Sequence, residues 1–292
     1  MRHLLPFLAL FLLFTGCDPD EVQTPDVAGC TDPDALNFDL NATSEDGSCE
    51  YEQAATTACA DGTESVEFDG HSYSVVQIGD DCWFAENLRT TLYSNGDSIF
   101  EPATPLEWLA QDSTGGQFTP QLNGTVITYG RDGFPCSSFS PTLEACEAEN
   151  SLAEYGRLYN HWAVRDSRNV CPDGWHVSSA SEWQTLQAWC IVNLNDPIEM
   201  SLKTTVGWDE FNGTNSTGFN AQPSGSLEGY GEFNWAGRSA IFWTTDEWTG
   251  PFNFETWFYQ GGGTAITIRE NDTLDYRDFA SMMGLSVRCI QD

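Results

Sequence analysis

The sequence predicts an α+β fold stabilised by disulfides, with one main helix, many short strands and long loops. Three observations lead to this prediction. Residues 179–182 are Ser-Ala-Ser-Glu, a helix start that precedes a stripe of large apolar side chains. Short apolar segments alternate with glycine-containing turns, and the chain contains ten cysteines. A chain of 292 residues with this composition is long enough to bury a substantial core.

The charge of the chain argues against two classes of partner. The sequence has 44 acidic residues against 11 lysines and arginines, which gives a formal net charge of -33. Such a surface repels the phosphate backbone of nucleic acids and anionic lipid headgroups. We therefore expect neither nucleic-acid binding nor peripheral adsorption to a membrane.

The first residues predict export. Residues 1–16 have a basic start and an apolar run ending at Phe14, which is too short to span a bilayer and is typical of a secretory signal peptide. The segment from Phe14 to Cys17 resembles the bacterial lipobox, in which the cysteine is lipidated, so Cys17 is the predicted lipidation site. The alternative is an ordinary cleaved signal with a free cysteine.

The residues after Cys17 predict the compartment. Asp18, Asp20 and Glu21 resemble the export signal of surface lipoproteins in Bacteroidetes-type bacteria. We therefore expect an outer-membrane protein that is held by its N-terminal lipid and faces the extracellular side. Residues 17–28 are polar and contain proline, which predicts a flexible tether.

Residues 29–52 are predicted to form a small acidic module pinned by two cysteines. Their sequence resembles GCTDPxAxNYxxxATxDDGSCxY, a module of secreted and surface proteins in Bacteroidetes-type bacteria. Alternating oxygen ligands suit calcium, and the spacing is not that of an EF-hand loop. Two interpretations stay open, a plain disulfide-pinned cluster of turns or a calcium site, and calcium is the only cofactor that the sequence suggests. The candidate ligands are Asp32, Asp34, Asp39 and Asp46.

The predicted large domain covers residues 56–292. Residues 66–78 alternate apolar and polar side chains around Asp69 and Gly70, which predicts a β-hairpin with a tight turn. Residues 102–154 form a predicted insertion. They hold two cysteines of their own, and long loops in a compact domain are often functional.

The C-terminal half of this domain carries the main predicted helix. The helix begins at the capping box of residues 179–182, and Pro197 ends it. Its core-facing stripe is Trp183, Leu186, Trp189 with Cys190, and Leu194. Short strands are expected at residues 240–245 and 285–290.

The cysteines beyond Cys17 predict disulfides, as is usual in an exported protein. Proximity in the sequence favours three disulfides between neighbouring cysteines. A disulfide between Cys171 and Cys289 would then close a long loop. Cys190 lies on the apolar face of the predicted helix and is the candidate free thiol. The local pairs are Cys30 with Cys49, Cys59 with Cys82, and Cys136 with Cys146.

Six motifs, in order along the chain, resemble those of the Fibrobacter succinogenes major paralogous domain. They include YGRLYN followed by an aromatic pair, CPDGWH followed by Glu-Trp, and the terminal GLSVRC. The resemblance implies membership of that family and says little about activity. By analogy, the arrangement resembles the C-type lectin-like and formylglycine-generating-enzyme-like folds. The motifs lie at residues 66–88, 155–163, 171–183, 218–225, 242–244 and 284–289.

The sequence favours binding over catalysis. Beyond the signal peptide the histidines are His71, His161 and His176, and none lies in a nucleophile motif, so we expect no enzyme. Aromatic side chains interleaved with carboxylates instead suggest a glycan or another surface macromolecule as partner. The alternatives are a protein scaffold without sugar binding and, less favoured, a secreted hydrolase. The candidate ligand-binding residues are Trp248, Trp257, Tyr259, Asp246 and Glu255.

Overall fold

The structure is a computed structural model of the whole chain. It divides into two compact units, residues 1–51 and residues 52–292, which are described separately. Of residues 126–128 and 148–151 only the backbone is described. The described residues are 26–31, 35, 37–48, 58–103, 107–108, 126–128, 148–229, 231–248, 262–269 and 274–292.

The smaller unit is built on a two-residue parallel pairing of β1 (Ala28–Gly29) with β2 (Ser44–Glu45). The carboxylate of Glu45 accepts hydrogen bonds from the main-chain N–H and the hydroxyl of Thr31, both at 3.0 Å. It also accepts one from the N–H of Gly47 at 2.8 Å. These contacts connect Thr31 with the turn at residues 45–47, and they use the acidic side chain as a turn cap rather than as a free charge.

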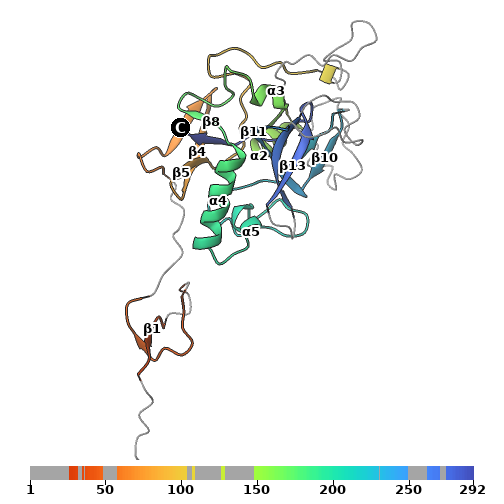
Figure 1. The fold of residues 1–292 in the computed structure, drawn as a ribbon. Helices are drawn as coiled ribbons and strands as arrows, with labels where there is room; N and C mark the ends of the chain where they lie inside the picture. The colour runs from red at the N-terminus through yellow and green to blue at the C-terminus, as the bar shows by residue number, and fades with distance from the viewer. Residues whose placement is uncertain are drawn as a thin grey trace, which may run out of the picture. The chain divides into compact units, whose positions relative to one another are not determined.

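The larger unit contains a five-stranded sheet in the order β3-β4-β5-β14-β8 (Figure 1). Its first two strands form the predicted hairpin, in which Asp69 and Gly70 both have a left-handed backbone, with φ of 48° and 72°. The final strand lies between β5 and β8, so the C-terminus is held inside the sheet. The strands are β3 (Ser65–Phe68), β4 (His71–Ile78), β5 (Asp81–Phe84), β8 (Trp175–Val177) and β14 (Cys289–Gln291).

A second, antiparallel sheet has three strands in the order β11-β12-β13. Its register shifts between Trp243 and Glu247 on β11. Two further pairs are antiparallel, β9 with β10 and β6 with β7. The strands are β6 (Val126–Thr128), β7 (Arg157–Tyr159), β9 (Ser224–Leu227), β10 (Phe233–Ala236), β11 (Ser239–Trp248), β12 (Gly262–Arg269) and β13 (Asp275–Ala280).

The longest described helix, α4 (Ala180–Asn193), begins at the predicted capping box. Ser179 accepts from the N–H of Glu182, and the Glu182 carboxylate accepts from the N–H of Ser179 at 2.6 Å. None of the described helices is long and apolar enough to cross a membrane. The others are α2 (Ala148–Tyr155), α3 (His161–Val164) and α5 (Ile198–Leu202).

Helix α4 packs between the two larger sheets (Figure 1). Its buried Trp183 stacks on Phe242 of β11 at 5.4 Å between ring centroids and meets Trp83 of β5 edge-on at 5.3 Å. A second core on the opposite faces of the same strands contains Tyr73, Trp243 and the disulfide of Cys171. Strands β4, β5, β11, β12 and β14 therefore contribute side chains to both cores.

The prediction of an α+β fold is wrong, because the described chain is β-rich with few short helices. The lectin-like and formylglycine-generating-enzyme-like analogy is withdrawn with it. The helix start is a strong local signal, whereas strands that are buried on both faces do not alternate in polarity. Strand β9 is buried at every position, so its sequence shows no period that identifies a strand. Residues 239–244 of β11 are also buried at every position, and there the short strand expected at residues 240–245 is confirmed.

Candidate functional site

An open polar cleft of about 430 Å³ lies in the larger unit. One wall comes from β4 and the segment that follows β5, and another from the loop between α5 and β9. A residue of α2 completes the described lining. The lining residues are Ser74, Ala85, Glu86, Arg89, Ala153, Asn215, Gly218, Asn220 and Gln222.

Glu86 is the fixed carboxylate of the first wall. It accepts a hydrogen bond from the N–H of Ser74 at 2.9 Å and contacts Nε2 of His71 at 2.8 Å. Burial raises the pKa of Glu86, but the hydrogen bonds from Ser74 and His71 outweigh burial, and the pKa lies below its ordinary value. The carboxylate is therefore ionised at neutral pH and held in one orientation.

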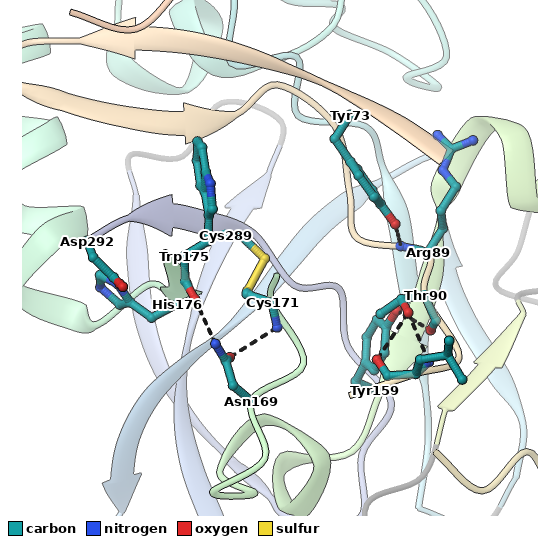
Figure 2. The surroundings of a disulfide bond; sticks show 11 residues. Tyr73, Arg89, Thr90, Tyr159, Asn169, Cys171, Trp175, His176, Cys289 and Asp292 are labelled. Carbon is teal, nitrogen blue, oxygen red and sulfur yellow. Dashed lines mark hydrogen bonds and ion pairs between the residues drawn. A yellow bond between two sulfur atoms is a disulfide. The ribbon is translucent and has the colours of Figure 1, made fainter. Parts of the chain in front are cut away.

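Arg89 places a guanidinium beside this carboxylate. Its Nη2 donates to Oε2 of Glu86 at 2.5 Å. Its main chain is fixed on both sides, since its N–H donates to the hydroxyl of Tyr73 at 3.1 Å and its carbonyl accepts from Nε of Arg157 at 3.0 Å (Figure 2 shows the Tyr73 contact). A guanidinium has five N–H donors, so most of them are not used by Glu86. The first wall can thus both donate and accept hydrogen bonds.

The second wall presents side-chain amides from a loop with an unusual backbone. Asn215, Gly218 and Asn220 all have positive φ, between 52° and 71°. Asn and Gly tolerate this left-handed conformation better than other residues. The side chain of Asn215 accepts from the N–H of Asn220 at 2.8 Å, and Thr217 donates to the carbonyl of Ser201 at 2.7 Å. The loop is therefore held rigidly while its amides line the cleft.

A buried arginine connects the two walls of the cleft through hydrogen bonds to both. The guanidinium of Arg288 donates to the carbonyls of Phe84, Phe219 and Asn220 at 2.9, 2.6 and 2.9 Å. Its Nε donates to the side-chain oxygen of Asn87 at 2.8 Å, and the group lies 4.4 Å from the ring centre of Phe219. Burial lowers the pKa of Arg288 to about 9, so it remains a cation at neutral pH.

The role of Arg288 was missed by the sequence analysis. A basic residue within the apolar terminal motif, Gly284 to Cys289, was the available signal, because a charge in a buried strand requires several partners. The partners themselves come from the motifs at residues 66–88 and 218–225. Three of the family-like motifs therefore meet at one guanidinium.

The predicted ligand-binding residues lie elsewhere. Asp246 accepts from the N–H of Ala180 at 2.7 Å and so caps the start of α4. Trp248, at the end of β11, is half-buried, and its ring lies 3.3 Å from the position that a Cβ at Gly262 would take. Neither is among the described residues that line the cleft. The other three candidates, Glu255, Trp257 and Tyr259, lie outside the described residues.

The structure pairs Cys171 with Cys289 and Cys59 with Cys82, with Cα–Cα distances of 5.9 and 5.4 Å. Asn169 supports the first bridge, since it accepts from the N–H of Cys171 and donates to the carbonyl of Trp175 (Figure 2). Cys30 is also in a disulfide, and Cys190 is a buried free thiol whose pKa burial raises to about 11. The remaining candidates, Cys17, Cys49, Cys136 and Cys146, lie outside the described residues.

The two described calcium candidates act as turn formers. Asp39 accepts from the N–H of Asn41, and Asp46 accepts from the N–H of Ser48, both at 2.9 Å. Within the described part of the chain, no group of three or more histidine, cysteine or acidic side chains could hold a metal ion. Asp32 and Asp34 lie outside the described residues.

The histidines are held by different partners. His176 lies between Glu182 at 2.8 Å and Asp292 at 2.7 Å, which raise its pKa to about 9 despite partial burial. His161 is buried against Trp243, and burial lowers its pKa to about 4. Neither contacts the hydroxyl of a serine or threonine or the thiol of a cysteine in any described hydrogen bond.

A β-rich domain, with two disulfides and a polar cleft among its described residues, thus carries the motifs noted in the sequence. Residues 76–291 match the family model described as the Fibrobacter succinogenes major domain. The match covers well over half of the chain, and the chain belongs to this family, as its motifs predicted. No curated protein and no solved structure shows a significant match.

Proposed function

We propose that this protein is a cell-surface lipoprotein whose large domain binds a glycan in the polar cleft. The observation that carries the proposal is the lining of the cleft. A fixed carboxylate at Glu86, a guanidinium at Arg89 and side-chain amides at Asn215, Asn220 and Gln222 face one cavity. Sugar hydroxyls both donate and accept hydrogen bonds, so they match this mixture of donors and acceptors.

The same lining favours binding over hydrolysis. Glycoside hydrolysis ordinarily needs two carboxyl groups placed across the bond to be cleaved. Glu86 is the one carboxylate among the described residues that line the cleft, and its lowered pKa makes it a poor proton donor. A secreted hydrolase at this cleft is therefore the weaker hypothesis.

A glycan array probed with the purified large unit, with and without a chelator, tests the proposal. We expect selective binding to some glycans that the chelator leaves unchanged. Gln222→Ala should weaken that binding about three- to tenfold, which corresponds to one lost hydrogen bond. Gln184→Ala, an exposed glutamine on α4, is the matched control and should bind like the wild type. Uniform, unselective signals on every glycan would contradict the proposal.

The lipid anchor is a separate part of the proposal and rests on the sequence. Cys17 follows a lipobox-like segment and precedes acidic residues. Metabolic labelling with a radioactive fatty acid should label the wild-type protein and not Cys17→Ser. Protease added to intact cells should digest the protein if it faces the extracellular side. Protection from the protease would contradict the surface location.

A protein partner is the second candidate, and one observation favours it. Ile191 and Val192, near the end of α4, are exposed. Large aliphatic side chains side by side on a helix surface can contact a partner protein. An array without selective glycan binding, together with cross-linking to a surface protein that occurs in the wild type and is lost in an Ile191→Ser, Val192→Ser double variant, would favour this candidate.

A further inference from the structure

Arg89 lines the cleft with hydrogen-bond donors that the protein itself does not use. Its Nη2 donates to Oε2 of Glu86 at 2.5 Å. Among the described contacts of Arg89, Nε is shielded from water without a hydrogen-bond partner, and Nη1 has no partner either. Nearly all buried polar groups in folded proteins are paired, so each exception calls for an explanation. A ligand in the cleft would meet a guanidinium with unused N–H groups.

Glu86 does not cancel the positive character of this wall. Its Oε1 accepts from the N–H of Ser74 at 2.9 Å, and its Oε2 contacts both Nε2 of His71 and Nη2 of Arg89. A carboxylate has about four acceptor positions, so most of those of Glu86 are already used by the protein. The charge of Glu86 is therefore compensated from three sides.

Arg288 adds a second positive charge behind both walls. Its guanidinium donates to the carbonyl of Asn220, which lines the cleft, and to that of Phe84, which precedes the lining residue Ala85. All its described hydrogen bonds end on neutral oxygens. Burial lowers its pKa only to about 9, so it is charged at neutral pH. A buried charge is screened less by salt than an exposed one, so its field acts on the cleft.

The charges at the cleft therefore favour an anion. Two guanidinium cations stand against the one carboxylate among the described lining residues, and a proton on His71 would add to the positive side. The carboxylate of Glu154, which follows the lining residue Ala153, lies beside Gly207, 3.7 Å from the position that a Cβ there would take. Gly207 is not among the described lining residues. The cleft is thus a locally positive site on a chain with a formal net charge of -33.

The overall charge limits the kind of anion that can bind. A strongly negative surface repels a polyanion, such as a heavily sulfated polysaccharide, over a long range. Physiological salt screens exposed charges beyond about 8 Å, so a single anionic group in the cleft interacts mainly with the cations beside it. A carboxylate is planar and can accept two parallel hydrogen bonds from one guanidinium. The amides of Asn220 and Gln222 can then bind the hydroxyls of the same ligand.

We infer that the cleft selects a glycan that contains a uronic acid, and that the carboxylate of this sugar binds Arg89. The inference rests on the proposed glycan binding and adds the chemical class of the sugar. The volume of the cleft, about 430 Å³, lies within the range of about 300–1,000 Å³ that small-molecule sites have. The carboxylate would give the unused donors of Arg89 a partner, and it would balance the excess positive charge.

Calorimetric titration of the purified protein with uronate oligosaccharides tests the inference. The probes are trigalacturonate, trimannuronate and a glucuronic acid-substituted xylo-oligosaccharide, each compared with its methyl ester, which keeps the size of the sugar and removes the charge. We expect the wild type to bind at least one of these acids about tenfold or more tightly than its ester, because a charge-assisted hydrogen bond is lost in the ester. A sulfated galacto-oligosaccharide should bind more weakly than the preferred uronate.

Variants of Arg89 identify the residue that carries the preference. Arg89→Gln keeps a polar side chain and removes the charge, so it should lose about ten- to a hundredfold in affinity for the acid and at most about threefold for the ester. Arg89→Lys keeps the charge without the fork of donors and should lie between the two. Arg238→Gln changes the net charge equally at an exposed ion pair with Asp209, and it should bind like the wild type.

The outcomes separate this inference from the proposed function. If the wild type binds neutral sugars or the esters as tightly as the acids, the cleft binds glycan and the uronate inference is wrong. Equal losses in Arg89→Gln and Arg238→Gln, or tighter binding of the sulfated sugar, would also contradict it. If the wild type binds no sugar of any kind, both proposals are wrong. The comparison of acid with ester needs only the wild type, so it decides the preference even if Arg89→Gln does not fold.

Discussion

Arg288 and His176 both hold the last strand of the domain, in contrasting surroundings. Arg288 is fully buried and donates only to neutral oxygens, three of them main-chain carbonyls. The side chain of His176 is 37% exposed and lies between the carboxylates of Glu182 and Asp292. Burial lowers the pKa of Arg288 to about 9, whereas the two carboxylates raise that of His176 to about 9.

The difference shows that opposite physical causes can give similar pKa values with unlike consequences. No hydrogen bond of the buried guanidinium goes to a negatively charged group. Arg288 therefore acts mainly through the directions of its donors, which hold the segment after β5 and the loop before β9 against the last strand. The exposed imidazole has two counter-charges but loses most of their effect to solvent. We expect the first to determine the shape of the cleft and the second to make a small, pH-dependent contribution to stability.

Replacing the buried cation should have the largest effect. Arg288→Met leaves the carbonyls of Phe84, Phe219 and Asn220 and the amide oxygen of Asn87 without their donor. We expect a loss of about 3–5 kcal/mol in the free energy of unfolding, measured by urea denaturation with tryptophan fluorescence. Arg288→Lys keeps the charge but not the fork of donors, so it should recover only part of this loss. If Arg288→Lys recovered all of the lost unfolding free energy, the positive charge of Arg288, and not the geometry of its donors, would be the cause of its stabilising effect.

The disulfide next to Arg288 should have the second-largest effect. Cys171 and Cys289 are 118 positions apart, so the bridge restricts the unfolded chain strongly. The Cys171→Ser, Cys289→Ser double variant should lose about 2–4 kcal/mol of unfolding free energy. Cys190→Ser, at the free thiol, is the control and should lose less. Equal losses would show that burial of the sulfur atoms outweighs the covalent bond.

The smallest effect, and the one that depends on pH, belongs to His176. Its pKa is raised from 6.5, so its contribution is full below pH 6.5 and disappears as the pH rises through about 9. The pKa of Glu182 is lowered from 4.5 to about 2, because bonds from His176 and Ser179 outweigh burial, so its contribution disappears as the pH falls through about 2. His176→Asn should therefore cost at most about 1 kcal/mol near pH 5–6, and nothing near pH 10.

The pH profile also sharpens the comparison between the two cations. Urea denaturation of the wild type, His176→Asn and Arg288→Met at a series of pH values would measure both effects together. We expect the loss in Arg288→Met to be constant between pH 5 and 8, since no group that titrates there is removed. A loss in His176→Asn that is equally constant would contradict the ion-pair explanation.

Several local features of the larger unit could be predicted from the sequence. The hairpin at Asp69 and Gly70 and the capping box at Ser179 were predicted correctly, because steric limits on φ and short-range hydrogen bonds decide them. Family membership also followed from motifs that are contiguous in the chain. A strand at residues 240–245, within β11, was also expected. The fold class was not predicted, because strands such as β9 are buried on both faces and lack the alternation that identifies a strand.

The candidate site was harder to predict than the local structure. Exposed aromatic residues were expected to mark it, but Asp246 caps α4, and Trp248 is half-buried and is not among the described cleft residues. Glu86 and Gln222 lie in family-like motifs, yet nothing in those motifs indicates that they face the same cavity.

By itself, the sequence determined the family, the hairpin turn and the start of the main helix, since each depends on atoms only a few residues apart. Tertiary structure alone decided the balance between strand and helix, the cleft and the bonds of Arg288, which join residues about 70 and 200 positions away. Those contacts form only when separate strands pair and bury both faces together. Their free energy comes from burial and from partners that no local stretch of the chain contains.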